Sequence, residues 1–188
     1  MSFSYRTKNE LCRMPTERRC CMIAELAGII HINGIIQISG KGRYRLKIST
    51  ENASLARRVF VLFKELYNIN VEVLVRKNTK LRKKNSYLLV IPTSSDTKQI
   101  LMDTYSLYVD ETGQIALARD INPAVIRKRC CKKAYLRGAF LGGGSMSDPE
   151  KMYHLEFVTY RESYGKSLCN FLNSLDLHAK MIERKNTY

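Results

Sequence analysis

The sequence predicts an α+β fold in which one unit of helices and strands occurs twice, related by a pseudo-twofold axis. Two observations carry this prediction. Short sequence blocks recur in the same order in both halves of the chain, and each half combines helical periodicity with the polar–apolar alternation that is typical of half-buried strands. The second unit ends soon after its last matching block, so we expect it to be incomplete.

The repeat consists of three pairs of blocks. The pairs are residues 19–28 and 129–138, 44–50 and 153–159, and 76–79 and 184–187, at offsets of 110, 109 and 108 residues. The first pair shares Arg, Cys, Cys, Ala, Leu and Gly, and the last pair is the tetrapeptide RKNT in both copies. Because the order is kept while the offset drifts by single residues, the chain is interpreted as an internal duplication.

Local patterns predict the elements of each copy. Thr16 and Pro123 are start signals for two helices that run through residues 26–32 and 136–141. The other expected elements are strand 43–49, helix 51–67, strands 71–75 and 87–91 and helix 94–107, then strand 153–159, helix 162–175 and strand 177–183. These boundaries predict an N-terminal extension (1–15), a first repeat (16–108), a linker (109–122) and a truncated second repeat (123–188).

The charge of the chain indicates the class of its partner. Lys and Arg number 32 against 17 Asp and Glu, a formal net charge of +15, with a sequence pI near 9.7. Such a surplus points to a polyanion, most often nucleic acid and less often an anionic membrane surface. No apolar run is long enough to span a bilayer or to form a signal peptide, so we expect an intracellular protein without a membrane partner.

The six cysteines are at positions 12, 20, 21, 130, 131 and 169. No C-x-x-C pair occurs, and adjacent cysteines chelate zinc poorly and rarely bond to each other. Reduced thiols that act as small hydrophobes are therefore expected, with no metal and no cofactor.

Small residues recur every fourth position in both predicted central helices. They are Cys20, Ala24 and Gly28 in the first copy and Cys130, Ala134 and Gly138 in the second. Such a stripe lets two helix backbones approach closely, whereas glycine in a helix otherwise costs about 1 kcal/mol relative to alanine. We expect the two helices to pack on each other; the alternative is that each packs on its own sheet.

Residues 26–34 (LAGIIHING) resemble the LAGLIDADG motif, and residues 136–144 (LRGAFLGGG) resemble a weaker second copy. The chain is more specifically similar to the WhiA family, through residues 50–58, 74–77, 130–145 and 148–150. The resemblance implies two αββαββα units that share the motif helices and form saddle-shaped antiparallel sheets over DNA. It also implies a link to transcription, sporulation and cell division in bacteria. The family carries a C-terminal helix-turn-helix domain, which we expect to be absent here.

The same resemblance bears on catalysis. A LAGLIDADG nuclease carries one carboxylate at the end of each motif helix, because divalent cations such as Mg²⁺ prefer anionic oxygen ligands. The corresponding positions are Asn33 and Gly143, which supply no carboxylate. We therefore expect no enzymatic activity. A metal-dependent nuclease or RNA maturase, and a protein-interaction module whose basic surface serves solubility, remain as alternatives.

Two basic segments predict where double-stranded DNA would bind. In strand 43–49, Arg43, Arg45 and Lys47 share one face, with Lys41 just before it. A basic turn adds Arg76, Lys77, Lys80, Arg82, Lys83 and Lys84, although a basic turn alone is often only a solvated loop. The matching outward positions in the second copy are His154, Glu156 and Val158, so we expect the positive charge to lie mainly in the first copy. Other regulatory proteins are further possible partners, and the patterns do not determine the oligomeric state.

Overall fold

The structure is a computed structural model that describes residues 2–40, 42–77 and 85–188. The first copy follows the order helix, two strands, helix, two strands, helix that the resemblance implies. Its elements are α2 (Arg19–Asn33), β1 (Gly34–Ser39), β2 (Arg43–Thr50), α3 (Ala53–Tyr67), β3 (Glu72–Arg76), β4 (Ser86–Val90) and α4 (Ser94–Asp103). The second copy contains α5 (Arg129–Gly143), β7 (Gly144–Met146), β8 (Leu155–Phe157) and α6 (Glu162–Asn173). The predicted α+β fold, in which one unit occurs twice, is confirmed.

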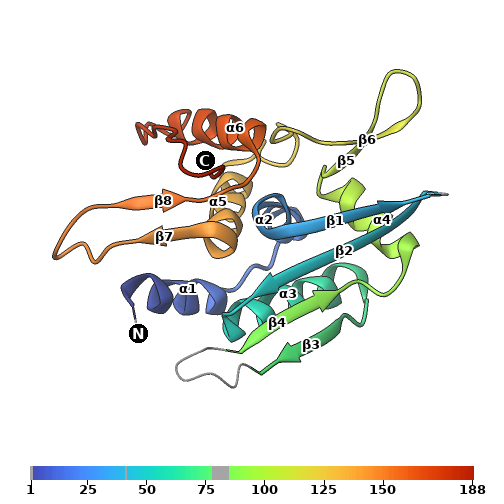
Figure 1. The fold of residues 1–188 in the computed structure, drawn as a ribbon, viewed down its shortest axis with the longest axis horizontal. Coiled ribbons are helices and arrows are strands. Elements are labelled where there is room, and N and C mark those ends of the chain that lie inside the picture. Colours follow the sequence, from blue (N-terminus) through green and yellow to red (C-terminus); the bar gives the residue numbers. More distant parts are fainter. Residues whose placement is uncertain (1, 41, 78–84) are drawn as a thin grey trace.

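Helices α2 and α5 lie side by side in the middle of the molecule, between the sheets of the two copies (Figure 1). Their backbones touch at the two predicted glycines. A Cβ atom on Gly28 would collide with the carbonyl oxygen of Tyr135, and one on Gly138 would collide with the carbonyl oxygen of Glu25. Only glycine permits this approach, so the two copies join through direct contact between helix backbones.

The first copy forms a four-stranded antiparallel sheet with the strand order β1-β2-β4-β3. Helices α3 and α4 cover one face of it. The side chain of Asn52 accepts hydrogen bonds from the backbone N–H groups of Ser54 and Leu55 and so begins α3, and Thr93 begins α4 in the same way. The apolar faces of these helices pack with Leu46, Ile48 and Leu89 of the sheet into one core.

The second copy is smaller. Strands β7 and β8 form a two-stranded antiparallel ribbon in which Gly144 pairs with Phe157 and Ser145 with Glu156. Its buried core packs α6 against α5 through Tyr135, Tyr164, Leu168 and Phe171. Strand β8 is largely exposed, so the ribbon has much less cover than the sheet of the first copy.

The predicted strand at residues 177–183 is wrong. This segment has no regular secondary structure, and beyond it only an isolated bridge joins Arg184 and Thr187. In the first copy the corresponding strand β3 pairs only with β4. Among the described residues of the second copy no strand occupies the position of β4. The backbone of residues 177–183 therefore has no neighbouring strand with which to form hydrogen bonds.

The segments expected to be linkers contain further elements. Residues Phe3–Arg13 form helix α1, whose Leu11 and Cys12 pack against the core of the first copy. Helix α4 ends at Asp103, before the predicted residue 107. The chain then forms a small hairpin of β5 (Leu107–Val109) and β6 (Ile115–Leu117), which begins at the end of the predicted first repeat and extends into the predicted linker. The reversal at the end of α4 places Tyr105 at a positive φ of 53°, which a continuing helix does not allow.

The central helices also begin later than Thr16 and Pro123, at Arg19 and Arg129. Within the described parts of the chain, none of the helices combines the length and the apolar character needed to cross a membrane.

Candidate nucleic-acid interface

The candidate interface is the face of the first sheet that α3 and α4 leave uncovered. In β2, Leu46 and Ile48 are fully buried in the core, whereas Arg43 and Arg45 are exposed and Lys47 is half-buried. Since successive side chains of a strand point to opposite faces, the three cations line the uncovered face. We call Arg43, Arg45 and Lys47 the basic stripe.

The strand register gives the neighbours of the basic stripe. On β1, Gln37 lies opposite Arg45 and the exposed Ile35 lies opposite Lys47. On the other side, Lys47 pairs with Val90 of β4, which pairs in turn with Glu72 of β3. The carboxylate of Glu72 is therefore two strands away from the stripe, and the immediate neighbours of the stripe on these strands carry no negative charge.

The other predicted basic segment lies at the opposite end of the sheet. Arg76, the last residue of β3, pairs with Ser86 and by register shares the face of the basic stripe. It is adjacent to the end of β2 that is far from Arg43. Lys77 follows Arg76 and is exposed. Five other predicted contacts, Lys41, Lys80, Arg82, Lys83 and Lys84, lie outside the described residues.

The equivalent face of the second copy carries a carboxylate. Register places Glu156 opposite Ser145, as Lys47 lies opposite Ile35 in the first copy. Ser145 donates a hydrogen bond of 2.7 Å to Glu156, and His154 Nε2 lies 3.5 Å from its other oxygen. The hydrogen bond from Ser145 lowers the pKa of Glu156 below its ordinary value, which keeps this position negatively charged.

The two positions that would carry catalytic carboxylates are the last residues of α2 and α5. The side-chain amide of Asn33 donates a 2.6 Å hydrogen bond to the carbonyl oxygen of Ser49, so it helps to join α2 to β2. At Gly143, a Cβ atom would collide with Cγ2 of Ile32 and lie 2.8 Å from the carbonyl oxygen of Val158. Gly143 thus has no side chain, and neighbouring atoms occupy the space that a side chain would need.

Beside the helix crossing lies a buried ion cluster that the sequence did not predict. Glu25 is fully buried, and its carboxylate accepts hydrogen bonds of 2.8 Å from Arg58 and 2.6 Å from Arg137. Because Arg58 donates two of these hydrogen bonds, the one from Thr16, of 3.1 Å, is the fourth. The side chain of Arg58 is only 11% exposed because it reaches inward to Glu25. No periodicity in α3 distinguishes it from the exposed Arg57.

A second buried polar group lies on the other side of the crossing. Nδ1 of His31 is 2.8 Å from the hydroxyl oxygen of Tyr135, which is 3.0 Å from the hydroxyl oxygen of Tyr164. Burial lowers the pKa of His31 from 6.5 to about 3, and the nearby Arg161 acts in the same direction. His31 is therefore neutral at physiological pH and has a packing role.

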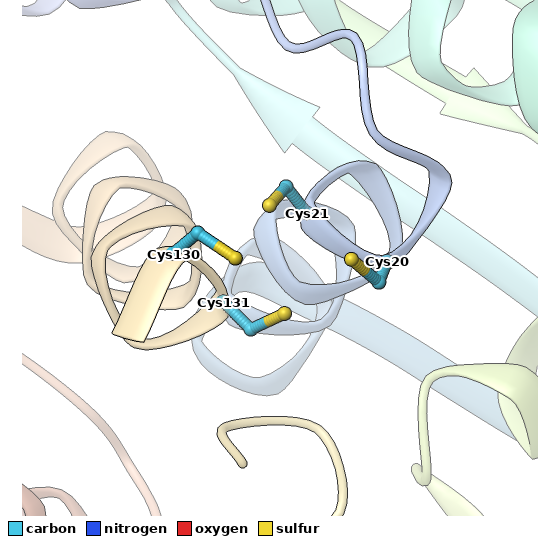
Figure 2. Close-up of side chains that lie close together, drawn as sticks. All are labelled: Cys20, Cys21, Cys130 and Cys131. Carbon is cyan, nitrogen blue, oxygen red and sulfur yellow. The ribbon is translucent and has the colours of Figure 1, made fainter. Parts of the chain in front are cut away.

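The paired cysteines at the start of both central helices form a third cluster. Cys20 and Cys21 belong to the first turn of α2, and Cys130 and Cys131 belong to the first turn of α5. Figure 2 shows their sulfur atoms directed toward the space between the two helices, and the four Sγ atoms all lie within 4.8 Å of one another. All four are free thiols. The signal in the sequence was the repeated Arg-Cys-Cys block, which had been interpreted through helix packing alone.

Comparison with known proteins identifies both halves of the chain. The model of the WhiA N-terminal LAGLIDADG-like domain matches residues 19–107, and that of the WhiA LAGLIDADG-like domain matches residues 132–188. The probable cell division protein WhiA of Alkaliphilus metalliredigens is 48% identical over 189 residues. That alignment covers 100% of this chain and 59% of the relative, so the chain spans about three fifths of that protein's length.

Solved structures agree with these matches. Full-length WhiA from Thermotoga maritima superimposes with a TM-score of 0.70 at 25% identity, covering 100% of this chain and 55% of that one. The homing endonuclease I-WcaI, solved bound to its DNA recognition sequence, shares the fold with a TM-score of 0.55 at 17% identity, covering 96% of this chain and 77% of that one. With family matches to both copies of the unit and a shared fold, the chain belongs to the WhiA family.

Proposed function

We propose that this chain is a non-catalytic DNA-binding part of a WhiA-type regulator that acts in bacterial transcription, sporulation and cell division. The observation that carries the proposal is the basic stripe on the uncovered face of the first sheet. The relative named as a probable cell division protein, and the endonuclease solved on DNA with the same fold, support the biological role and the class of partner respectively.

The dimensions of the stripe suit a DNA groove. Residues of a strand rise about 3.4 Å each, so Arg43 and Lys47 are roughly 14 Å apart, close to the roughly 12 Å width of the major groove of B-DNA. Beyond the part of the sheet that pairs with β4, residues 36–39 of β1 and 43–46 of β2 continue as a two-stranded ribbon, an element that the major groove admits. The cations would contact phosphates along the groove edges, which favours binding that depends on the DNA backbone more than on base sequence.

Strand cleavage is not expected from this chain. A metal that activates a nucleophile at the scissile phosphate needs anionic oxygen ligands, and Asn33 and Gly143 provide none. The amide of Asn33 is already engaged with Ser49, and the space beside Gly143 is occupied by Ile32. Other regulatory proteins are further candidates for partners, and a DNA partner would place the chain on the bacterial nucleoid.

A titration of the 188-residue chain with duplex DNA at several salt concentrations tests this function. We expect the logarithm of the association constant to fall linearly with the logarithm of salt concentration. Reversing the stripe (Arg43→Glu, Arg45→Glu and Lys47→Glu) should weaken binding to any duplex and reduce the slope by about 0.9 for each lost phosphate contact. Salt-independent or absent binding by the unaltered chain would instead favour a protein-interaction module.

The chain offers a matched control for the reversed stripe. Arg57 and Lys64 on α3 and Lys98 on α4 are exposed on the helices that cover the other face of the sheet. Their reversal to Glu changes the net charge by the same amount and should leave the salt slope much less affected. Equal losses in the two triple variants would mean that only the overall charge of the chain matters.

A plasmid assay tests the absence of nuclease activity. Supercoiled plasmid incubated with the chain and Mg²⁺ or Mn²⁺ should remain intact. Metal-dependent cleavage that disappears on changing Asn33→Ala would establish the nuclease alternative.

A further inference from the structure

We infer that the four cysteines at the starts of α2 and α5 form a structural zinc site that cross-links the two copies of the unit. Cys20, Cys21, Cys130 and Cys131 supply the four thiolate ligands. The ion that they bind is Zn²⁺. The inference is independent of DNA binding.

The geometry of the cluster matches a tetrahedral zinc site. A Zn–S distance of about 2.3 Å implies sulfur–sulfur separations of about 3.8 Å in a regular tetrahedron. The four Sγ atoms already lie within 4.8 Å of one another, so binding requires contractions of at most about 1 Å. Four thiolates without an open position are typical of zinc that stabilises a fold.

The cluster follows the symmetry of the duplication. Cys20 corresponds to Cys130 and Cys21 to Cys131 at the offset of 110 residues. Adjacent cysteines in one chain segment chelate poorly, which is why each pair considered separately suggested no metal. Two pairs on neighbouring helices supply the four ligands that neither pair supplies alone.

The surrounding charge favours an anionic metal–thiolate complex at the cluster. Two helix N-termini, each with a partial positive charge, meet at the cluster, and neither has a side-chain cap or an acidic residue in its first turn. Arg18 and Arg19 precede one cysteine pair, and Lys128 and Arg129 precede the other. These cations are repelled by the positive ends of the helix dipoles unless an anion lies near them. A zinc ion with four thiolates carries a net charge of −2 and would offset them.

Solvent can reach the cluster from two sides. A cavity of about 420 Å³ is lined by Cys21 and Cys130, and another of about 430 Å³ is lined by Cys20 and Cys131. Each cavity therefore exposes one cysteine from each helix, so an ion can enter without unfolding of the helix crossing. Bound there, it would fix the ends of α2 and α5 about two turns before Gly28 and Gly138, and thereby the angle between the two copies.

Metal analysis of the purified 188-residue chain is the first test. Elemental analysis after purification without chelators should give one zinc ion per chain. Replacement by Co²⁺ should produce the charge-transfer band in the near ultraviolet and the intense visible bands of a tetrahedral tetrathiolate site. Removal of the metal should lower the melting temperature, and added Zn²⁺ should restore it, because a ligand of the folded state stabilises it by mass action.

Matched serine variants locate the ligands. Cys130→Ser and Cys20→Ser should each weaken zinc binding by more than about 100-fold, since loss of even an outer partner of a metal ligand costs roughly 10- to 100-fold. Cys12→Ser and Cys169→Ser alter free cysteines outside the cluster and should retain full zinc binding. Circular dichroism of each variant distinguishes lost ligation from lost folding.

The unaltered chain by itself can overturn the inference. A chain that binds neither Zn²⁺ nor Co²⁺ with its thiols reduced has no such site. Thiol counting and mass spectrometry that find Cys20–Cys131 and Cys21–Cys130 disulfides in the protein from cells would also contradict it. Zinc retained equally by the cluster variants and by the two control variants would place the ion elsewhere.

Discussion

The central helix of the first copy is followed by a four-stranded sheet that two helices cover. The central helix of the second copy is followed by a two-stranded ribbon whose strand β8 is largely exposed. The uncovered face of the first carries the basic stripe, and the same face of the second carries Glu156. The two copies nevertheless meet at equivalent glycines on equivalent helices. The comparison suggests that the helix crossing sets the geometry of the pair, while each sheet is free to differ in size and charge.

The copies also differ just beside the crossing. At the offset of 110 residues, Glu25 of α2 corresponds to Tyr135 of α5. Glu25 holds two arginines by charge-assisted hydrogen bonds, whereas Tyr135 joins His31 and Tyr164 through neutral hydrogen bonds. Equivalent positions thus use different chemistry to satisfy buried polar groups, and their substitution should have unequal effects.

The largest expected effect follows from Glu25→Gln. Removing the charge leaves Arg58 and Arg137 without their buried counterion, which should lower the free energy of unfolding by about 3–5 kcal/mol. Tyr135→Phe in the second copy removes only neutral hydrogen bonds and should cost about 1–3 kcal/mol. Urea denaturation of both variants, with exposed Glu10→Gln as control, measures the difference. Equal losses in the free energy of unfolding would show that the charged and the neutral hydrogen-bond clusters beside the helix crossing contribute equally to stability.

The next effect concerns the crossing itself. Gly138→Ala places a methyl group against the backbone of Glu25 and should destabilise the chain by about 1–3 kcal/mol, as overpacking of a core does. Gly142→Ala in the same helix meets Cγ2 of Ile32 at 3.4 Å, an ordinary contact. It should therefore be neutral, or stabilising by up to about 1 kcal/mol, because alanine favours helix. If thermal melts rank these variants in the reverse order, the helices do not pack as described.

The third effect depends on pH. The folded-state pKa of His31, about 3, lies below its ordinary value of 6.5, so below pH 6.5 the unfolded chain binds a proton that the folded chain excludes. This group should therefore reduce stability as pH falls from 6.5 to about 3, by up to about 1.4 kcal/mol per pH unit, and no further below that range.

Substitution of His31 isolates that contribution. His31→Gln removes the titrating group and should flatten the pH dependence of unfolding in this range, whereas His178→Gln, at an exposed site, should leave it unchanged. An unchanged slope in His31→Gln would assign the acid sensitivity to other groups.

The smallest expected effect is a gain of binding. Glu156→Lys gives the second copy the cation that the first copy has at Lys47, and Ser145 remains opposite it. If the second ribbon also lies near the DNA bound in the proposed function, affinity should rise and the salt slope should steepen by about 0.9. The control Glu65→Lys adds the same charge at an exposed site on α3, which covers the other face of the first sheet. Equal gains in DNA affinity for both variants would mean that only the net charge of the chain matters.

Much of the fold could be predicted because the repeated blocks of the duplication are recognisable in the sequence. The stripe of small residues predicted the helix crossing, and alternation in residues 43–49 predicted β2 and the outward direction of its cations. The error at residues 177–183 has a physical cause: alternation indicates that a segment can form a strand, but a strand also needs a partner for its backbone. Helix α1 was missed because its sequence is polar and its packing surface is supplied by α3 and α5.

The ion cluster around Glu25 and the cluster of four cysteines could not be predicted from local sequence patterns. Arg58 and Arg57 are neighbours of the same type, and only the position of Glu25 on another helix makes one buried and the other exposed. Likewise, the four cysteines are two separated pairs in sequence and become one cluster only when α2 and α5 pack together. Such sites arise between elements, so their prediction required the tertiary arrangement.

The proposed function requires DNA to bind the sheet of the first copy through the basic stripe. The most direct measurement places a photo-crosslinking amino acid at Ile35 or at Ser145, which are equivalent positions opposite Lys47 and Glu156. Irradiation with duplex DNA should cross-link strongly from position 35 and weakly from position 145, and reversing the stripe to Glu should abolish the first signal. Stronger cross-linking from position 145, or a signal at position 35 that persists in the reversed stripe, would contradict the account.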